Sequence, residues 1–221
     1  MAFKSDIKDF IQYMLFGFLC TIIIAYFFRD KEGSSLNNAI VDSDTNNITS
    51  SLPIISKITP FTLTNQYNRP IGLTNYLGAP WLADIIFTRC PTICPKLTQT
   101  LSSLQTELGP EVGFMTLTTD PSHDTPEKLL QFSVLHGQSN TNWNFLTGPK
   151  ETLMKLAVED LKLVSYPKEK GKQTDPNDLF VHSGNLILVD AEGRVRATFE
   201  HDSTNLIKRI RFSLKQLQGG K

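Results

Sequence analysis

The chain has 221 residues, of which 40% are hydrophobic, and its 22 basic residues balance its 22 acidic ones. A chain of this length can build one good core with an appendage, and zero net charge argues against a nucleic-acid binder. Only three cysteines occur, which excludes a scaffold held together by several disulfides.

An uncharged apolar segment lies near the N-terminus, at residues 11–28. Its length is close to the minimum for a membrane-spanning helix, and Tyr13 and Tyr26 stand where aromatic side chains favour the two interfaces. A cleaved signal peptide is the main alternative, but no small-residue cleavage site follows, and large residues around Cys20 make it a poor lipoprotein site. We therefore predict one membrane anchor within residues 1–32. The charges that flank it are equal on the two sides, so they do not decide its orientation.

Residues 33–57 are rich in Ser, Asn, Asp and Thr and are predicted to form a flexible tether. A coil of this length spans roughly 25–30 Å on average. Residues 58–221 show no internal repeat and alternate between strand-like and helix-like runs, so they are predicted to form one domain.

The first predicted elements of this domain are a hairpin, a buried strand and a helix. Strand-like residues 61–63 and 71–73 flank a turn-rich segment, which predicts the hairpin. Residues 81–87 are almost continuously apolar, as expected for a central strand covered on both faces. The helix is predicted from Pro95 to Glu107, before Gly109.

The second half of the domain continues this alternation. A strand is predicted at residues 112–117, and Thr125 is predicted to cap a helix that runs from Pro126 to His136. The remaining predicted elements are a helix at 151–163, strands at 186–189 and 195–199, and an amphipathic helix at 203–217. The pattern predicts an α/β fold in which helices cover a sheet.

Cys90 and Cys94 lie between the predicted central strand and the helix that follows it. A helix start carries unpaired N–H groups and the positive end of the macrodipole, which favour a thiolate. Thiolates bind metal ions and attack disulfides, so this placement predicts a chemical site. A buried structural pair or a simple disulfide is the alternative, which the flanking Pro91 and Pro95 disfavour.

A cysteine pair at this place is the thioredoxin arrangement, although thioredoxins usually have two residues between the sulfurs. The longer spacing, in Thr88-Arg89-Cys90-Pro91-Thr92-Ile93-Cys94-Pro95, resembles the Sco/SenC family of membrane-anchored copper proteins that assist assembly of cytochrome c oxidase. Further segments carry the same resemblance: 61–63, 120–127, 143–148, 182–183 and 186–190.

The resemblance implies a thioredoxin-like fold, with a central mixed sheet flanked by helices and an N-terminal β-hairpin, behind one transmembrane helix. It also implies that Cys90, Cys94 and His182 bind one copper ion per chain, as Cu(I) or Cu(II). Two thiolates and one imidazole suit copper, whereas structural zinc would want a fourth ligand. Family members commonly carry an acidic residue before this histidine, and Val181 in its place leaves the support of the imidazole in question.

Other polar residues receive structural interpretations. Asp120, Asp124 and Thr125 are assigned to a turn and helix cap rather than to acid–base catalysis. The loop at residues 166–179 is interpreted as a solvated connector, with a lid that carries His182 toward the sulfurs as the alternative. The three other histidines are taken as structural or solvent-facing: His123, His136 and His201.

Two functions remain open at this point. The first is a non-enzymatic metallochaperone that delivers copper to the dinuclear copper centre of cytochrome c oxidase. The second is a thiol-disulfide oxidoreductase in which Cys90 and Cys94 reduce the cysteines of an oxidase subunit or another extracytoplasmic protein. His182 separates them, because a metal site requires it and a redox dithiol does not. A third interpretation, an anchored interaction domain with incidental cysteines, would make both thiols dispensable.

The resemblance also implies partners and a location. The expected partners are the copper-bearing oxidase subunit, other copper chaperones and the membrane, without nucleic acid or a small-molecule substrate. The family displays its domain on the outer side of an energy-transducing membrane. Because no transit-like peptide precedes the apolar segment, a bacterial inner membrane with a periplasmic domain is favoured over the mitochondrial inner membrane.

Overall fold

The computed structural model describes residues 52–136, 142–169, 171, 179–182 and 184–219, together with all of their side chains except that of His182. The predicted anchor and most of the predicted tether lie outside these residues. Across the described ranges, no helix is long and apolar enough to cross a membrane.

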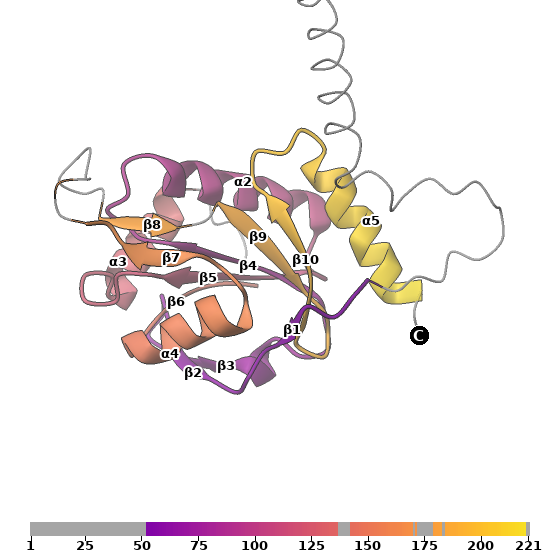
Figure 1. Cartoon of the computed structure of the whole chain (residues 1–221), viewed down its shortest axis with the longest axis horizontal. Coiled ribbons are helices and arrows are strands. Elements are labelled where there is room, and N and C mark those ends of the chain that lie inside the picture. The colour runs from indigo at the N-terminus through magenta and orange to yellow at the C-terminus, as the bar shows by residue number, and fades with distance from the viewer. Residues whose placement is uncertain (1–51, 137–141, 170, 172–178, 183, 220–221) are drawn as a thin grey trace, which may run out of the picture. The chain divides into compact units, whose positions relative to one another are not determined.

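A single eight-stranded sheet forms the centre of the domain (Figure 1). Its strands, in spatial order, are β1 (Ser56–Lys57), β10 (Arg194–Glu200), β9 (Asn185–Val189), β4 (Trp81–Ile86), β5 (Gly113–Thr118), β6 (Trp143–Thr147), β2 (Thr62–Asn65) and β3 (Pro70–Gly72). The β4–β5 and β5–β6 pairs are parallel and the other pairs are antiparallel. This mixed α/β sheet and the β2–β3 hairpin confirm the predicted thioredoxin-like architecture.

The central strand β4 is buried along its whole length. The strand lies between β5 and β9, and helices cover both faces of the sheet, so every side chain of β4 is removed from water. This burial is why its sequence is almost continuously apolar. The apolar run at residues 81–87 therefore predicted both the strand and its central position correctly.

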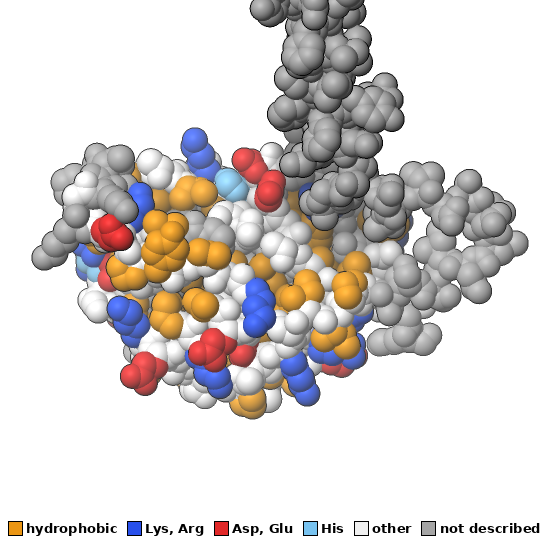
Figure 2. Space-filling view, in the orientation of Figure 1, with side chains coloured by type: hydrophobic (Ala, Val, Ile, Leu, Met, Phe, Trp, Pro, Cys, Tyr) orange, Lys and Arg blue, Asp and Glu red, His pale blue; other side chains and the backbone are white. Residues whose placement is uncertain are grey.

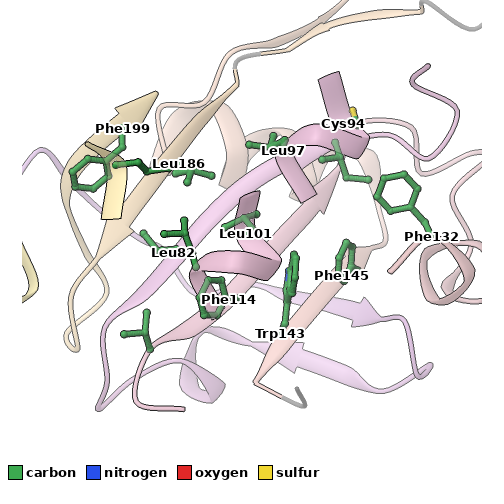
Figure 3. Close-up of a cluster of buried hydrophobic side chains, with 14 of the residues drawn as sticks. Leu82, Cys94, Leu97, Leu101, Phe114, Phe132, Trp143, Phe145, Leu186 and Phe199 are labelled. Atoms are coloured by element: carbon green, nitrogen blue, oxygen red, sulfur yellow. The ribbon is translucent and has the colours of Figure 1, made fainter. Parts of the chain in front are cut away.

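Two clusters of apolar side chains occupy the two faces of the sheet. One face is covered by α2 (Ile93–Leu108), α3 (Pro126–Leu135) and α5 (Leu206–Gly219), and Figure 3 shows part of its cluster. The opposite face is covered by α4 (Lys150–Met154) and the π-helical turn η2 (Lys155–Asp160). Cys94 lies at one end of the first cluster and is followed along α2 by Leu97 and Leu101 (Figure 3).

Helix α2 begins two residues earlier than its proline predicted. Pro95 is the third residue of α2 rather than the first, which is tolerated because the first N–H groups of a helix have no intrahelical acceptor. Cys94 therefore belongs to the first helical turn. Gly109 ends the helix as expected, with a left-handed φ of 77°.

The predicted helix at 151–163 is instead a short α-helix followed by a wider π-helical turn. At the end of this turn, the Asp160 Oδ2 accepts hydrogen bonds from Thr59 N at 2.8 Å and Thr59 Oγ1 at 2.7 Å. The Ser56 Oγ donates to the Asp160 carbonyl at 2.5 Å. These contacts bind the start of the domain to η2, and periodicity along one segment carries no information about them.

The end of the predicted tether is part of the fold. The strand β1 pairs with β10, and Ile55 N donates to the Val195 carbonyl at 2.8 Å. Further upstream, the Arg196 guanidinium donates to the carbonyls of Leu52 and Pro53. Residues 52–57 thus contact the domain that was predicted to begin at residue 58.

Arg196 and Asp190 form an ion pair of which both side chains are buried. The Arg196 Nη1 and Arg194 Nε donate to the Asp190 Oδ2 at 2.6 and 2.7 Å, and the backbone N–H groups of Glu192 and Arg194 donate to its Oδ1. Burial of Asp190 opposes its ionisation, but the hydrogen bonds from Arg196 and Arg194 outweigh this effect and hold its pKa below the ordinary value of 3.8.

Replacing Asp190 with Asn is expected to lower the free energy of unfolding by about 3–5 kcal/mol at neutral pH, because Arg196 would keep a buried, uncompensated charge. Since the folded pKa is depressed, the wild-type carboxylate contributes stability above about pH 4 and loses it as the pH falls through the folded pKa. Urea denaturation at several pH values measures both effects. The variant should lose less stability on acidification, and Glu192→Gln, at the exposed Arg194 pair, should change stability by under about 1 kcal/mol.

Candidate metal centre

The two cysteines of the domain lie where the chain passes from β4 into α2. Cys90 is in the connecting loop, and Cys94 is in the first turn of the helix. Both are reduced thiols with buried side chains. The Cys90 N–H donates to the Phe87 carbonyl at 3.1 Å, and the Phe87 N–H donates to the Cys94 sulfur at 3.4 Å. These bonds fold residues 87–94, called here the cysteine loop, into a compact turn.

The Cys90 side chain lies near enough to Cys94 to affect the ionisation of its thiol. Burial raises the pKa of the Cys94 thiol far above its ordinary value, and the neighbouring Cys90 adds to the effect. The prediction that the helix start makes this sulfur easier to deprotonate is therefore wrong for Cys94 in the metal-free protein. Removal of the sulfur from water outweighs the hydrogen bond that it accepts from the Phe87 N–H.

A buried carboxylate fastens the cysteine loop to the neighbouring strand. The Thr88 N–H donates to the Asp124 Oδ2 at 3.1 Å, and the Thr88 Oγ1 donates to its Oδ1 at 2.5 Å. The Thr118 Oγ1, at the end of β5, also donates to Asp124. Asp124 is completely buried, so its hydrogen bonds are not exchanged for water. It therefore has a second role beyond the turn that the sequence predicted.

Arg89 forms an ion pair on the outer side of the cysteine loop. Its Nη2 lies 2.5 Å from the Asp120 Oδ2, and about a third of the arginine side chain is exposed. Asp120 is held in turn by its N–H, which donates to the Thr118 Oγ1 at 3.0 Å. The segment at 120–124 thus contacts the cysteine loop twice. The predicted helix cap is confirmed as well, since the Thr125 side chain accepts from Lys128 N.

His182 is the last residue of β8 (Phe180–His182), which pairs with β7 (Ser165–Pro167) in a separate two-stranded sheet. His182 lies opposite Ser165, whose Oγ is 2.5 Å from the Thr119 Oγ1. Thr119 follows β5 and bonds through its N–H to the Ile86 carbonyl at the end of β4. The β7–β8 sheet is therefore attached at the carboxyl ends of β4 and β5, where the cysteine loop also lies.

Contacts on both sides of His182 bring its backbone to this loop. Two residues before it, the Phe180 ring lies edge-to-face on Phe87, with 5.3 Å between the centroids. Two residues after it, a Cβ built on Gly184 would lie 3.0 Å from the Ile93 Cδ1, next to Cys94. The sequence segments at 87–94 and 180–184 are thus neighbours in space, as the resemblance implied.

The side chain of His182 is outside the described structure. Among the side chains that are described, no three of the histidine, cysteine and carboxylate types gather closely enough to hold a metal ion. The described donors at this place are the two thiols, and His182 remains a prediction for the third ligand. Val181, in place of the acidic residue common in the family, lies opposite Tyr166.

Each of the other three histidines contacts residues other than the cysteines. The His123 ring lies 3.2 Å from the Lys128 Nζ, and the His136 ring packs on Phe132 with 4.4 Å between the centroids. Partial burial lowers the pKa of His136. The His201 Nδ1 lies 3.0 Å from the Gly184 carbonyl. A structural role fits these contacts.

An exposed apolar surface lies next to the predicted site. Figure 2 shows hydrophobic side chains gathered on this face over the region of β7 and β8. Val164 and Tyr166, just before and within β7, are each about half exposed. The loop at 166–179, predicted as a connector, joins the paired strands β7 and β8. The middle of this loop lies outside the described residues.

The sheet order, the helices on both faces and the paired thiols after β4 define a thioredoxin-like protein with a dithiol site. The sequence model of the SCO1/SenC family matches residues 54–215. The chain belongs to the SCO1/SenC family, which confirms the resemblance.

Relatives support this assignment. The SCO1 protein homolog of Bacillus subtilis is 34% identical over 146 residues, which cover 65% of this chain and 73% of the relative. The solved structure of BsSco, described as a Sco-family cytochrome c oxidase assembly protein with a disulfide switch, is 28% identical and has a TM-score of 0.65, over 77% of this chain and 98% of its own. Bradyrhizobium japonicum ScoI with copper bound is 21% identical, with a TM-score of 0.61 over 73% of this chain and 99% of its own, and this likeness shows the fold alone.

Replacing Asp124 with Asn is expected to lower the free energy of unfolding by about 1–3 kcal/mol, because one amide cannot accept from both Thr88 groups and Thr118. Loosening the loop should also weaken metal binding at the two thiols. Denaturation and competition with a Cu(I) chelator measure the two effects. Asp202→Asn, at an exposed position, is the matched control, and equal behaviour of the two variants would contradict this role.

Proposed function

We propose that this protein is a membrane-anchored copper metallochaperone that carries one copper ion on Cys90, Cys94 and His182 and delivers it to the dinuclear copper centre of cytochrome c oxidase. The observation that carries the proposal is the convergence of two distant segments. The Phe87–Phe180 ring contact and the approach of Gly184 to Ile93 support it, because they bring the chain on both sides of position 182 to the cysteine loop.

The donor set favours copper as the cargo. Two soft thiolates and one imidazole suit Cu(I) and can also accept Cu(II), while zinc in a structural site takes four protein ligands. The family is one of copper-binding proteins involved in oxidase assembly, and ScoI of Bradyrhizobium japonicum has been solved with copper bound. Copper is the cargo that fits both the chemistry and the family.

The residues around the thiols have separate tasks in this proposal. Asp124 and the Phe87 N–H fix the cysteine loop, so that the two sulfurs are held together before the ion arrives. Burial opposes ionisation of the metal-free Cys94 thiol, and binding of the ion would displace its proton. A protein that must release its cargo benefits from thiols that readily regain protons.

The second function, thiol-disulfide exchange, is favoured by the proximity of the two reduced thiols. In this reaction one thiolate attacks the partner's disulfide, the second sulfur resolves the mixed disulfide, and the protein is oxidised as the partner is reduced to two thiols. A disulfide switch has been described for BsSco. The raised pKa of Cys94 favours Cys90 as the attacking sulfur.

We propose the location and domain order from the sequence. Residues 1–32 anchor the chain through the span at 11–28, residues 33–51 form the connection, and the domain that follows, which includes the predicted 58–221, holds the site. The proposed location is a bacterial inner membrane with the domain in the periplasm. The proposed partners there are the copper-bearing oxidase subunit and other copper chaperones.

The copper proposal predicts one tightly bound Cu(I) per chain under reducing conditions. Loss of a hydrogen-bond partner of a ligand typically weakens metal binding about 10–100-fold. Loss of a ligand itself should weaken it more, which is the result expected for Cys90→Ser, Cys94→Ser and His182→Ala. Competition with a chelator measures the affinity, and the Cu(II) absorption spectrum reports the ligands. His123→Ala is the control, and a His182→Ala protein with the affinity and spectrum of the wild type would refute the ligand assignment.

The redox proposal predicts a different pattern. Turnover of a disulfide substrate should vanish in Cys90→Ser and Cys94→Ser, while His182→Ala should retain much of it because exchange needs no imidazole ligand. The assay follows the appearance of substrate thiols, with Cys20→Ser as the control. Persistent turnover in the two variants at positions 90 and 94 would reject this function.

A further inference from the structure

Helix α5 concentrates basic side chains on a chain whose net charge is zero. Four of its residues are basic, all four are exposed, and the helix contains no acidic residue: Lys208, Arg209, Arg211 and Lys215. A cluster of charges of one sign on an exposed helix face is the usual electrostatic footprint of a surface that binds the opposite sign.

An exposed aromatic side chain lies at the centre of this basic face. The inward face of α5 consists of Leu206, Ile210 and Ser213, which are buried. Phe212 is 59% exposed. At helical spacing it is one turn from both Lys208 and Lys215, so the three side chains share the outward face. A large apolar ring among cations is typical of helices that lie on a lipid surface.

The neighbouring elements neutralise only part of this face. The Arg211 guanidinium lies 3.6 Å from the Glu107 carboxylate and donates to the Glu107 carbonyl at 3.0 Å. Arg209 lies over the Phe199 ring at 5.4 Å and donates to the Ser203 Oγ. Within the described residues, no ion pair engages Lys208 or Lys215. Two lysines and the ring between them are therefore available to a ligand.

The described chain begins beside the C-terminal part of the same helix. Arg196 binds the Leu52 carbonyl, and Leu52 lines a pocket of about 660 Å³ together with Leu214 and Leu217 of α5. The 51 residues upstream of this point contain the apolar segment at 11–28. A tether of residues 33–51, with an average span of roughly 22–26 Å, that ends beside α5 would hold this helix within reach of the bilayer.

We propose that the outward face of α5, centred on Lys208, Phe212 and Lys215, docks on the anionic lipid headgroups of the membrane that anchors the chain. This inference rests on the membrane anchoring in the proposed function. The cations bind the phosphate groups of acidic lipids, and the Phe212 ring enters the headgroup region. Docking replaces free motion on the tether by one orientation of the domain.

This orientation leaves the thiols uncovered. Arg211 contacts Glu107 at the C-terminal end of α2, whereas Cys94 lies in the first turn of that helix. The two positions are separated by about 20 Å along the helix axis at 1.5 Å per residue. A membrane-bound partner can therefore approach the cysteine loop while α5 is held on lipid.

The test uses the full chain carrying Phe212→Trp, reconstituted into vesicles of brominated phosphatidylcholine with or without phosphatidylglycerol. The native Trp81 and Trp143 are completely buried and give a constant background. Docking predicts that bromine quenches the fluorescence of the introduced indole strongly only when phosphatidylglycerol is present, and that high salt removes the quenching. Equal quenching in both kinds of vesicle would overturn the proposal.

Charge reversal supplies the matched comparison, made in the Phe212→Trp background. Lys208→Glu with Lys215→Glu should abolish the quenching of the introduced indole, while Lys150→Glu with Lys155→Glu, at exposed positions on α4 and the start of η2, should leave it unchanged. Undiminished quenching in the first pair would refute docking. If that pair instead lost copper transfer to an oxidase subunit without any change in lipid contact, the face would belong to a protein partner and the proposal would fail.

Two further readouts separate this inference from the proposed function. Retention of the chain on pure phosphatidylcholine vesicles at high salt reports the anchor, and Cu(I) affinity reports the metal site. The α5 variants should alter neither. A chain that fails either readout but shows lipid-dependent quenching of the introduced indole would retain docking and lose the anchor or the copper function.

Discussion

The site depends on how the cysteine loop is held at the carboxyl end of the buried strand β4. Asp124, itself completely buried, accepts from the backbone and side chain of Thr88 and from Thr118, and so joins the loop to the end of β5. A buried carboxylate with several donors is costly to disturb, because any donor that it loses is left without water as a substitute. These bonds hold the loop that carries the two thiols, and the β7–β8 sheet is attached at the same carboxyl ends of β4 and β5.

Burial gives the thiols their chemical character. A sulfur at a helix start is expected to ionise readily, yet the Cys94 thiol has a raised pKa because it is removed from water and lies against Cys90. In the proposed functions, a soft metal ion would replace the protons without bringing water into the site, and metal transfer and disulfide exchange would use the same pair of thiols.

The two ends of α2 have different environments. Its first turn carries Cys94 beside the segment at 180–184, with the exposed apolar side chains of Val164 and Tyr166 nearby. Its last turn carries Glu107, which pairs with Arg211 of the basic helix α5. An apolar surface next to the thiols suits a protein partner, while a cationic helix suits anionic lipid. A protein that must meet a membrane-bound partner benefits from having these two surfaces apart.

Local sequence determined the elements and the position of the cysteines. The continuous apolar run at 81–87, the turn-rich hairpin and the Thr125-Pro126 cap each encode their structure within a few residues, and all three appear in the fold. The pairing of Asp124 with Thr88, the π-helical turn closed on Thr59 and the contacts of Phe180 and Gly184 with the cysteine loop join residues that are distant along the chain. The raised pKa of Cys94 likewise follows from burial by other elements. Only the tertiary structure decided these features, because burial and long-range hydrogen bonds depend on which segments become neighbours, and no periodicity within one segment encodes that.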